Sequence, residues 1–152
     1  MRTHRSFIRR VAGQRGQALI ETALTLPIVL VISISIFEFG RALQVWQLLT
    51  NAAREGARVA VLPGSTPDAV RQRALDYMAA GGLQNRALNQ INVQSNAQIV
   101  MSGNPVSASQ VTISYPFNFM LLNPIMQLIV RGSRVGAPIT MTASALMRNE
   151  AP

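Results

Sequence analysis

The sequence contains no cysteine and no lysine, and its single histidine, His4, lies close to the N-terminus. Without cysteine the chain can form neither disulfides nor thiolate zinc sites. Beyond the first residues the chain has neither histidine, the commonest general base, nor cysteine, the thiol nucleophile, so these usual catalytic groups of hydrolases are missing there. These absences predict a protein that is not an enzyme, with no catalytic residue, no metal site and no cofactor.

Basic charge is distributed unevenly along the chain. All 14 basic residues are arginines, against 6 acids, which gives a formal net charge of +8. The arginines of the first 15 residues have no acid among them: Arg2, Arg5, Arg9, Arg10 and Arg15. A nucleic-acid-binding domain should instead carry a basic stripe on its folded elements. The distribution therefore argues against nucleic acid as a partner and marks residues 1–16 as a basic leader.

A long apolar run, Gln17–Phe37, follows the leader and contains one charge, Glu21. About 20 mainly apolar residues are enough to cross a bilayer, and Glu38 and Arg41 would close the run as interface anchors. A buried core helix is rarely apolar on every face in a small protein, and a cleavable secretory signal is shorter and ends in a small-residue cleavage site. We therefore predict a transmembrane helix over residues 17–38.

The charges on either side of the span predict its orientation. Five arginines precede it, whereas only Arg41 follows closely. By the positive-inside rule the leader lies in the cytoplasm. Residues 39–152 would then form a domain on the far side of the membrane.

The exported part should begin as an amphipathic continuation of the same helix, because apolar residues recur there every three or four positions. We expect this helix to end at about residue 62, before the breaker pair Pro63-Gly64. A second helix at about 66–80 is indicated by Ser65 or Thr66 as N-cap and by Gly81-Gly82 as the stop. Trp46 lies too far along the first helix for an aromatic belt, so we expect it in the core.

Alternating apolar and polar residues dominate the rest of the chain. They predict strands at about 91–93, 98–102, 110–115 and 139–147, with a hairpin turn at 102–105. The expected fold class is α+β, in which a small antiparallel sheet of about three to four strands packs on the long helix. The apolar segment 119–130 is too short to span a membrane. It either covers the sheet, which its length favours, or lies on the membrane surface.

Small residues recur every four positions late in the long helix, at Ala52, Gly56 and Ala60. This spacing places a flat strip on one helix face. Glycine inside a helix costs about 1 kcal/mol relative to alanine, so close approach of another backbone is a plausible reason for Gly56. The strip would receive either the chain's own sheet, which we favour, or another subunit.

Glu21 requires an explanation, because a carboxylate at the bilayer centre costs about 2.5–3.5 kcal/mol. It could lie near enough to the cytoplasmic edge to reach water or Arg15. Alternatively, cleavage after Gly16 would make Gln17 a new N-terminus and Glu21 the fifth residue. The new α-amine could then neutralise a carboxylate in its own chain or in a neighbouring one.

Four segments of the first half form a recognisable set: Arg15–Glu21, Leu26–Pro27, Ile36–Ala42 and Asn51–Arg58. Together they resemble the TadE-like family, the minor pilins or pseudopilins of tight-adherence (Flp) pilus systems, whose N-termini are type IV pilin-like. The first of these segments is similar to the prepilin-peptidase site of type IV pilins, which are cut after glycine and carry glutamate at the fifth mature position. One position differs, because Flp-type sites usually have an aromatic residue where this chain has Thr22. The strands near 111–117 and 139–148 extend the resemblance more weakly.

The resemblance implies a pilin-like, non-catalytic subunit of the bacterial inner membrane, with a periplasmic C-terminal domain. Its partners would be other pilin-like subunits, the pilus assembly platform and, for cleavage after Gly16, a prepilin peptidase. An alternative stays open: a bitopic protein that is never cleaved and serves as a binding or scaffold module in a secretion or surface-assembly apparatus.

Overall fold

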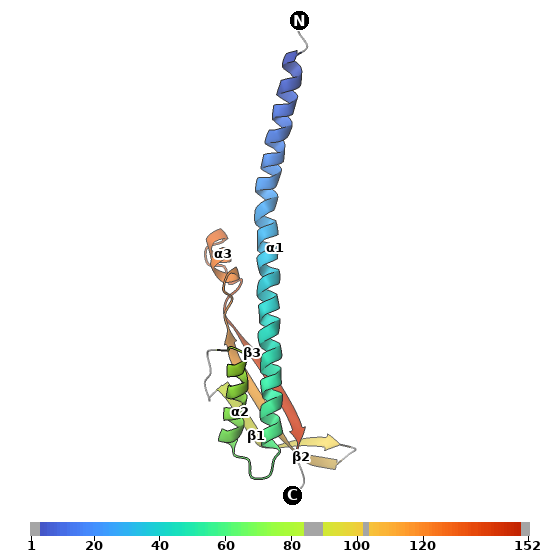
Figure 1. Cartoon of the computed structure of the whole chain (residues 1–152), viewed down its shortest axis with the longest axis vertical. Coiled ribbons are helices and arrows are strands. Elements are labelled where there is room, and N and C mark those ends of the chain that lie inside the picture. Colours follow the sequence, from blue (N-terminus) through green and yellow to red (C-terminus); the bar gives the residue numbers. More distant parts are fainter. Residues whose placement is uncertain (1–3, 84–89, 102–103, 150–152) are drawn as a thin grey trace.

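The computed structural model describes residues 4–83, 90–101 and 104–149. It has the order helix, helix, strand, strand, helix, strand (Figure 1). The elements are α1 (His4–Ala60), α2 (Pro67–Ala80), β1 (Ile91–Met101), β2 (Asn104–Phe117), α3 (Leu122–Ile129) and β3 (Ile139–Arg148). This arrangement confirms the expected α+β class with a long N-terminal helix.

Helix α1 dominates the molecule, and its N-terminal half projects alone beyond the other elements (Figure 1). Its 57 residues correspond to about 85 Å of helix. It begins before the predicted start at residue 17 and passes through Pro27 without interruption. It ends at Ala60, two residues earlier than expected, and the turn that follows includes Gly64 at a positive φ of 76°.

Helix α2 begins and ends close to its predicted bounds. The hydroxyl of Thr66 accepts a hydrogen bond from the Ala69 N–H at 3.2 Å, so Thr66 is the N-cap, and Pro67 opens the first turn. The N–H of Gly81 closes the last turn on the Tyr77 carbonyl. The apolar face of α2 is buried, and α2 packs against α1.

The sheet has three antiparallel strands in the order β1-β2-β3. The two short strands predicted at 91–93 and 98–102 form one strand, β1, because a register shift between Gln94 and Ala97 accommodates the polar residues between them. Strands β1 and β2 remain paired up to Met101 and Asn104. Residues 102–103 of the predicted turn lie outside the described residues.

The hydrophobic core lies between the C-terminal part of α1, α2 and the inner face of the sheet. Its buried members are Leu49, Ala52, Ala53, Ala57, Val70, Ala74, Met78, Leu83, Ile91, Val111, Ile113 and Ala143. Most of the residues that α1 contributes are alanines, and small side chains allow a close approach between a helix and a sheet. We call the unit formed by residues 42–60 of α1, α2 and the sheet the head.

Two predictions about apolar residues are wrong. Trp46 is 49% exposed, because it lies about 100° around the helix from the inward-facing Val45, and small residues occupy most of the inner face. The segment 119–130 does not lie over the sheet. It forms α3, which packs on α1 nearer the N-terminal end than the sheet does (Figure 1).

Gly56 lies in the core, where a side chain would face α2 and β2. A Cβ at this position would be 3.4 Å from Val111 Cγ1 and 3.5 Å from Ala74 Cβ, which are ordinary van der Waals contacts. We therefore expect Gly56→Ala to raise the free energy of unfolding of the head by up to about 1 kcal/mol, because alanine is the better helix former. Gly56→Leu should lower it by about 1–3 kcal/mol through overpacking. Thermal unfolding of the full chain in detergent, followed by circular dichroism, measures both; a destabilised Gly56→Ala would contradict the packing.

Candidate functional site

The span of α1 is exposed over nearly all of its surface. It is the one helix in the described residues that is long and apolar enough to cross a membrane, and its most apolar window contains no buried residue. Every residue from Gly16 to Leu30 is exposed, including large apolar side chains such as Leu24 and Val29. Such a surface is unfavourable in water and suits lipid. The helix therefore fits a single-pass membrane protein.

The hydroxyl groups of the span are satisfied within the helix. Thr22, Thr25, Ser33 and Ser35 each donate to the carbonyl four residues earlier, at 2.7–2.9 Å. These bonds lower the free-energy cost of placing the hydroxyl groups in lipid, because none of these hydroxyls is left without a hydrogen-bond partner. Glu21 differs, because its carboxylate is exposed on the helix surface and is the one formal charge between Gly16 and Phe37.

Gly16 also lies inside α1, five positions before Glu21. A Cβ added there would meet no atom within 4 Å. Glycine costs about 1 kcal/mol in a helix, and within the described residues the packing of the chain does not require it here. The roles expected for Gly16, Gln17 and Glu21 remain predictions, since they concern a cleaved chain and its neighbours.

A second polar cluster lies at the other end of the span, around Glu38. This side chain is fully buried, and its Oε2 is 3.0 Å from Nη2 of Arg41. Its Oε1 accepts a hydrogen bond of 2.6 Å from the N–H of Leu121, which lies 83 residues later in the chain. Arg41 donates in turn to the carbonyl of Asn118, and its guanidinium lies 4.4 Å from the ring centroid of Phe117. Glu38 and Arg41 therefore join α1 to the segment between β2 and α3.

Glu38 also stabilises the start of α3. The N-cap residue of that helix is Leu121, whose side chain cannot accept a hydrogen bond. In a capping box a glutamate of the same helix binds the N–H of the N-cap residue. Here Glu38 supplies this interaction from α1, and a carboxylate at a helix N-terminus is also favoured by the helix dipole. The predicted position of Glu38 and Arg41 at a membrane interface remains a prediction.

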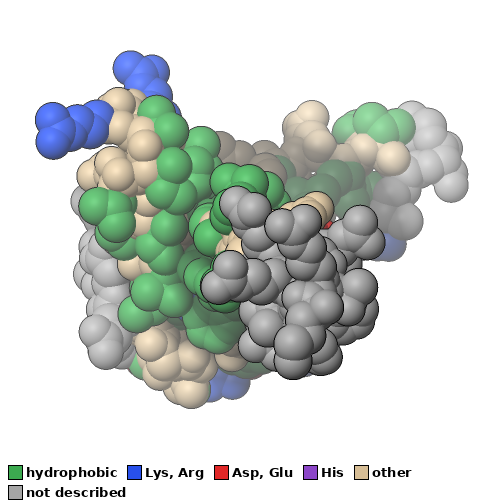
Figure 2. All heavy atoms as spheres, turned by 90° about the horizontal axis from the view of Figure 1, so that it is seen from above, with side chains coloured by type: hydrophobic (Ala, Val, Ile, Leu, Met, Phe, Trp, Pro, Cys, Tyr) green, Lys and Arg blue, Asp and Glu red, His purple; other side chains and the backbone are tan. Residues whose placement is uncertain are grey.

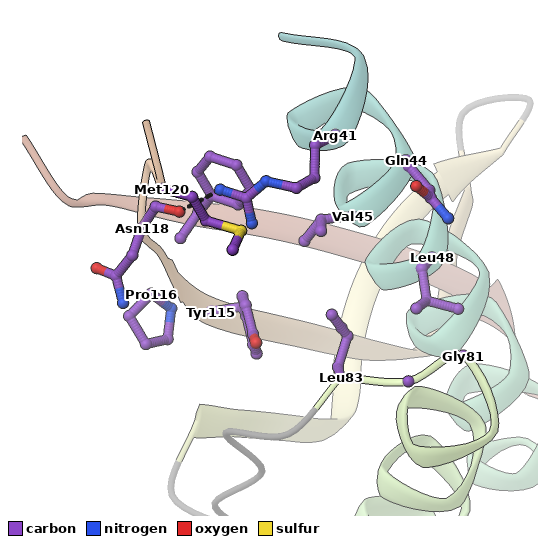
Figure 3. Close-up of a pocket in the computed structure, with 12 residues that line it drawn as sticks. Arg41, Gln44, Val45, Leu48, Gly81, Leu83, Tyr115, Pro116, Asn118 and Met120 are labelled. Carbon is purple, nitrogen blue, oxygen red and sulfur yellow. Dashed lines mark hydrogen bonds between the residues drawn. The ribbon is translucent and has the colours of Figure 1, made fainter. Parts of the chain in front are cut away.

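The cleft next to Arg41 has a volume of about 530 Å³ and lies between α1, the Gly81–Leu83 turn and the end of β2 (Figure 3). Tyr115 and Asn118 border it together with apolar side chains. Arg41 is the only charged side chain in its described lining. The described lining therefore offers hydrogen-bonding groups and apolar surface, without a carboxylate or imidazole for acid–base chemistry.

The strip of small residues on α1 faces α2 and the sheet of the same chain. Ala52 and Gly56 are buried against α2 and the sheet, and the Ala60 carbonyl accepts a hydrogen bond from the Ser109 hydroxyl at 3.3 Å. Close to this strip, Arg73 of α2 donates two hydrogen bonds to Glu55, at 2.6 and 3.1 Å. These bonds lower the pKa of the Glu55 carboxyl below its usual value.

Sequence reasoning missed the partners of Glu38. An i,i+3 pair with Arg41 could be read from spacing, whereas the Leu121 N–H and the Asn118 carbonyl are backbone groups that carry no sequence signal. One signal could have indicated these partners. The apolar segment 119–130 has no polar side chain at the N-cap position, Leu121, so the N–H groups at the start of its helix need an acceptor from another part of the chain.

A single exposed helix of membrane-spanning length that continues into a small α+β head fits the class of membrane-anchored proteins. Residues 16–58 match the family model described as TadE-like protein, which confirms the resemblance from Gly16 to Arg58 of α1. No curated protein and no solved structure gave a match.

Proposed function

We propose that this chain is a non-catalytic, pilin-like subunit that acts in the assembly of a tight-adherence (Flp-type) pilus. It would be held in the bacterial inner membrane with its N-terminus in the cytoplasm and its head in the periplasm. The observation that carries the proposal is the pair of Gly16 and Glu21. Gly16 is a helical glycine at which an added Cβ would have no packing contact within 4 Å in the described residues, and Glu21 is the lone carboxylate of the apolar span that follows. The family match over residues 16–58 supports it.

The mechanism begins with cleavage after Gly16 by a prepilin peptidase. Cleavage removes the basic leader and leaves an α-amine on Gln17. In lipid, this amine and a carboxylate attract each other far more strongly than in water, because the effective dielectric constant is low. The amine of one subunit would pair with Glu21 of a neighbour, so that subunits stack through their N-terminal helices and present their heads outside the membrane.

The mature N-terminus tests this mechanism directly. We expect mass analysis of the chain, purified from a host that makes the peptidase, to show that the mature protein begins at Gln17. Gly16→Leu should block the cut, because a bulky side chain replaces glycine at the scissile bond. Gly40→Leu is the matched control: it changes another α1 glycine with no atom within 4 Å and should be processed normally. A wild-type chain that still begins at Met1 in that host would refute the mechanism.

One observation favours a second candidate, a bitopic scaffold that is never cleaved. Helix α1 runs from His4 through Gly16 without a break, so the leader and the span form one continuous element. Crosslinking separates the two functions, and the absence of native cysteine makes single-cysteine variants unambiguous. Under oxidation, Ile20→Cys should give a disulfide-linked dimer that depends on removal of the leader only where subunits stack through their N-terminal helices. A scaffold would give none.

A further inference from the structure

The region around α3 exposes an unusual amount of apolar surface. Leu128 is 87% exposed, and Ile129 and Val130 are more than half exposed. Just before the helix, Met120 and Leu121 are exposed as well. Contiguous exposed apolar surface of this kind marks an interaction site in soluble proteins. Viewed from the N-terminal end of the molecule, hydrophobic side chains gather on this face and arginine side chains lie towards its edge (Figure 2).

The position of α3 indicates what covers this surface. Within residues 31–38 of α1, the partly or fully buried residues are Val31, Ile34, Ser35 and Glu38. Their spacing of i, i+3, i+4 and i+7 places them in a stripe on one side of the helix. Helix α3 packs on α1 at this level (Figure 1). The neighbouring positions of α1, Ile32, Ile36 and Phe37, are exposed and belong to the span. The apolar surface of α3 is therefore continuous with the lipid-facing surface of α1.

We propose that α3 lies in the outer leaflet of the membrane and is a second membrane contact of the protein, beside the span. The Glu38–Leu121 hydrogen bond places the start of α3 at the end of the span. From there its 8 residues extend at most about 12 Å towards the N-terminal end of α1. A hydrocarbon core is about 30 Å thick, so α3 enters one leaflet and cannot cross the bilayer. Amphipathic helices of peripheral proteins lie at a similar depth.

Two arginines follow α3 on the way back to β3, and their side chains are long enough to reach towards the lipid headgroups. Arg131 and Arg134 are exposed, and no acid occurs between Asp76 and Glu150. Long arginine side chains keep their stems in apolar surroundings while the guanidinium reaches the interface, where it pairs with phosphates. Helix α3 is also held at its base, because the Asn123 side-chain amide donates to the Gly136 carbonyl at 2.9 Å.

Gly136 keeps this base compact. Its φ of 74° favours glycine, and a Cβ there would lie 2.7 Å from the Asn123 backbone nitrogen. The start of α3 is therefore held by two hydrogen bonds, from the Leu121 N–H to Glu38 and from the Asn123 amide to the Gly136 carbonyl. These bonds fix the position of α3 relative to α1. The inference rests on the membrane anchoring in the proposed function, and it is independent of pilus assembly.

Depth-dependent fluorescence quenching tests the inference on the full chain in proteoliposomes. An environment-sensitive dye is attached to single cysteines at Leu128 (Leu128→Cys), in mid-span (Ile28→Cys) and on β1 of the head (Val100→Cys). Vesicles contain phosphatidylcholine and phosphatidylglycerol, brominated either near the headgroup or at the chain ends. We expect the Leu128 label to be quenched several-fold more than the Val100 label by both sets of bromines. The Ile28 label should be quenched more by deep than by shallow bromines.

The possible outcomes distinguish failure of the inference about α3 from failure of the proposed membrane anchor. If the Ile28 label is quenched and the Leu128 label behaves like the Val100 label, α3 is outside the lipid and the inference is wrong, while the anchor stands. If the Ile28 label is not quenched, the anchor itself fails. A Leu128 label that is unquenched by lipid and shielded from aqueous iodide shows a protein partner on α3 and also overturns the inference. An Ile129→Cys label provides a second reading, and unchanged Trp46 emission confirms that each variant is folded.

Discussion

Replacement of Glu38 with leucine should release α3 and its preceding segment from α1. The substitution removes the ion pair with Arg41 and leaves the Leu121 N–H without its acceptor. Breaking a buried charge pair costs about 3–5 kcal/mol, and we expect about 3 kcal/mol here because the Arg41 side chain is 27% exposed and retains access to water. Hydrogen exchange of the Leu121 amide measures the effect. A loss of about 3 kcal/mol corresponds to exchange that is faster by about a hundredfold.

Two further variants show whether the effect belongs to Glu38. Glu38→Gln keeps an acceptor for the Leu121 N–H but loses the charge, so its exchange rate should lie between those of the wild type and Glu38→Leu. Glu55→Leu is the control, because Glu55 forms an i,i+3 pair with Arg58 at 3.8 Å and is bound by Arg73 of α2, so its loss affects the contact between α1 and α2 and not the start of α3. Glu55→Leu should leave the hydrogen-exchange rate of the Leu121 amide unchanged. Equal exchange in Glu38→Leu and the wild type would mean that the junction is held by apolar packing alone.

The elements that could be predicted from the sequence are those whose signal is local. The Thr66 cap, the Gly81 stop and the alternation around Val111 act within a few residues, and the structure follows them. The sequence predicts two strands where the structure has β1, because the alternation of apolar and polar residues is interrupted between Val93 and Gln98. Pairing with β2 holds the two segments in one strand, and the resulting bulge depends on a partner remote in sequence.

The errors concern apolar residues, because hydrophobicity alone does not reveal what covers a side chain. Trp46 was expected in the core, but the inner face of α1 is largely occupied by small residues that bring the sheet close. The segment 119–130 was expected over the sheet in preference to the membrane. Its position depends on Glu38, through a hydrogen bond between α1 and a distant backbone N–H. The sequence predicts Glu38 and Arg41 only as interface anchors, and it contains no information on this contact with a distant backbone group.

The hypothesis about the start of the span rests on a short spacing in an otherwise apolar sequence, and it stays a prediction. Gly16 and Glu21 are five positions apart, and the structure places both on an exposed helix with no packing need for the glycine. What neither sequence spacing nor one folded chain supplies is the partner of the carboxylate. The hypothesis assigns that role to the α-amine of a processed neighbour, so its test must be made on assembled subunits.

The Glu21→Ala change should abolish assembly while leaving the protein in the membrane. It removes the carboxylate that would pair with the neighbouring α-amine, so stacking through the N-terminal helices loses its charge attraction. Insertion should be unaffected or improved, because a carboxylate in the span costs up to about 2.5–3.5 kcal/mol and alanine does not. Pilus yield in sheared cell fractions measures assembly, and carbonate-resistant pelleting measures insertion.

The control for Glu21→Ala is Thr25→Ala, which removes another polar side chain of the span. The Thr25 hydroxyl donates to the Glu21 carbonyl at 2.9 Å within the same helix, so the substitution removes a bond within one chain and no charge, and it should leave assembly intact. Glu21→Gln separates charge from polarity: it should fail like alanine if the amine is the partner, and should assemble if a hydrogen bond suffices. Normal pilus yield from Glu21→Ala would exclude the charge pair, and the exposed apolar surface of α1 would then have to hold the subunits together unaided.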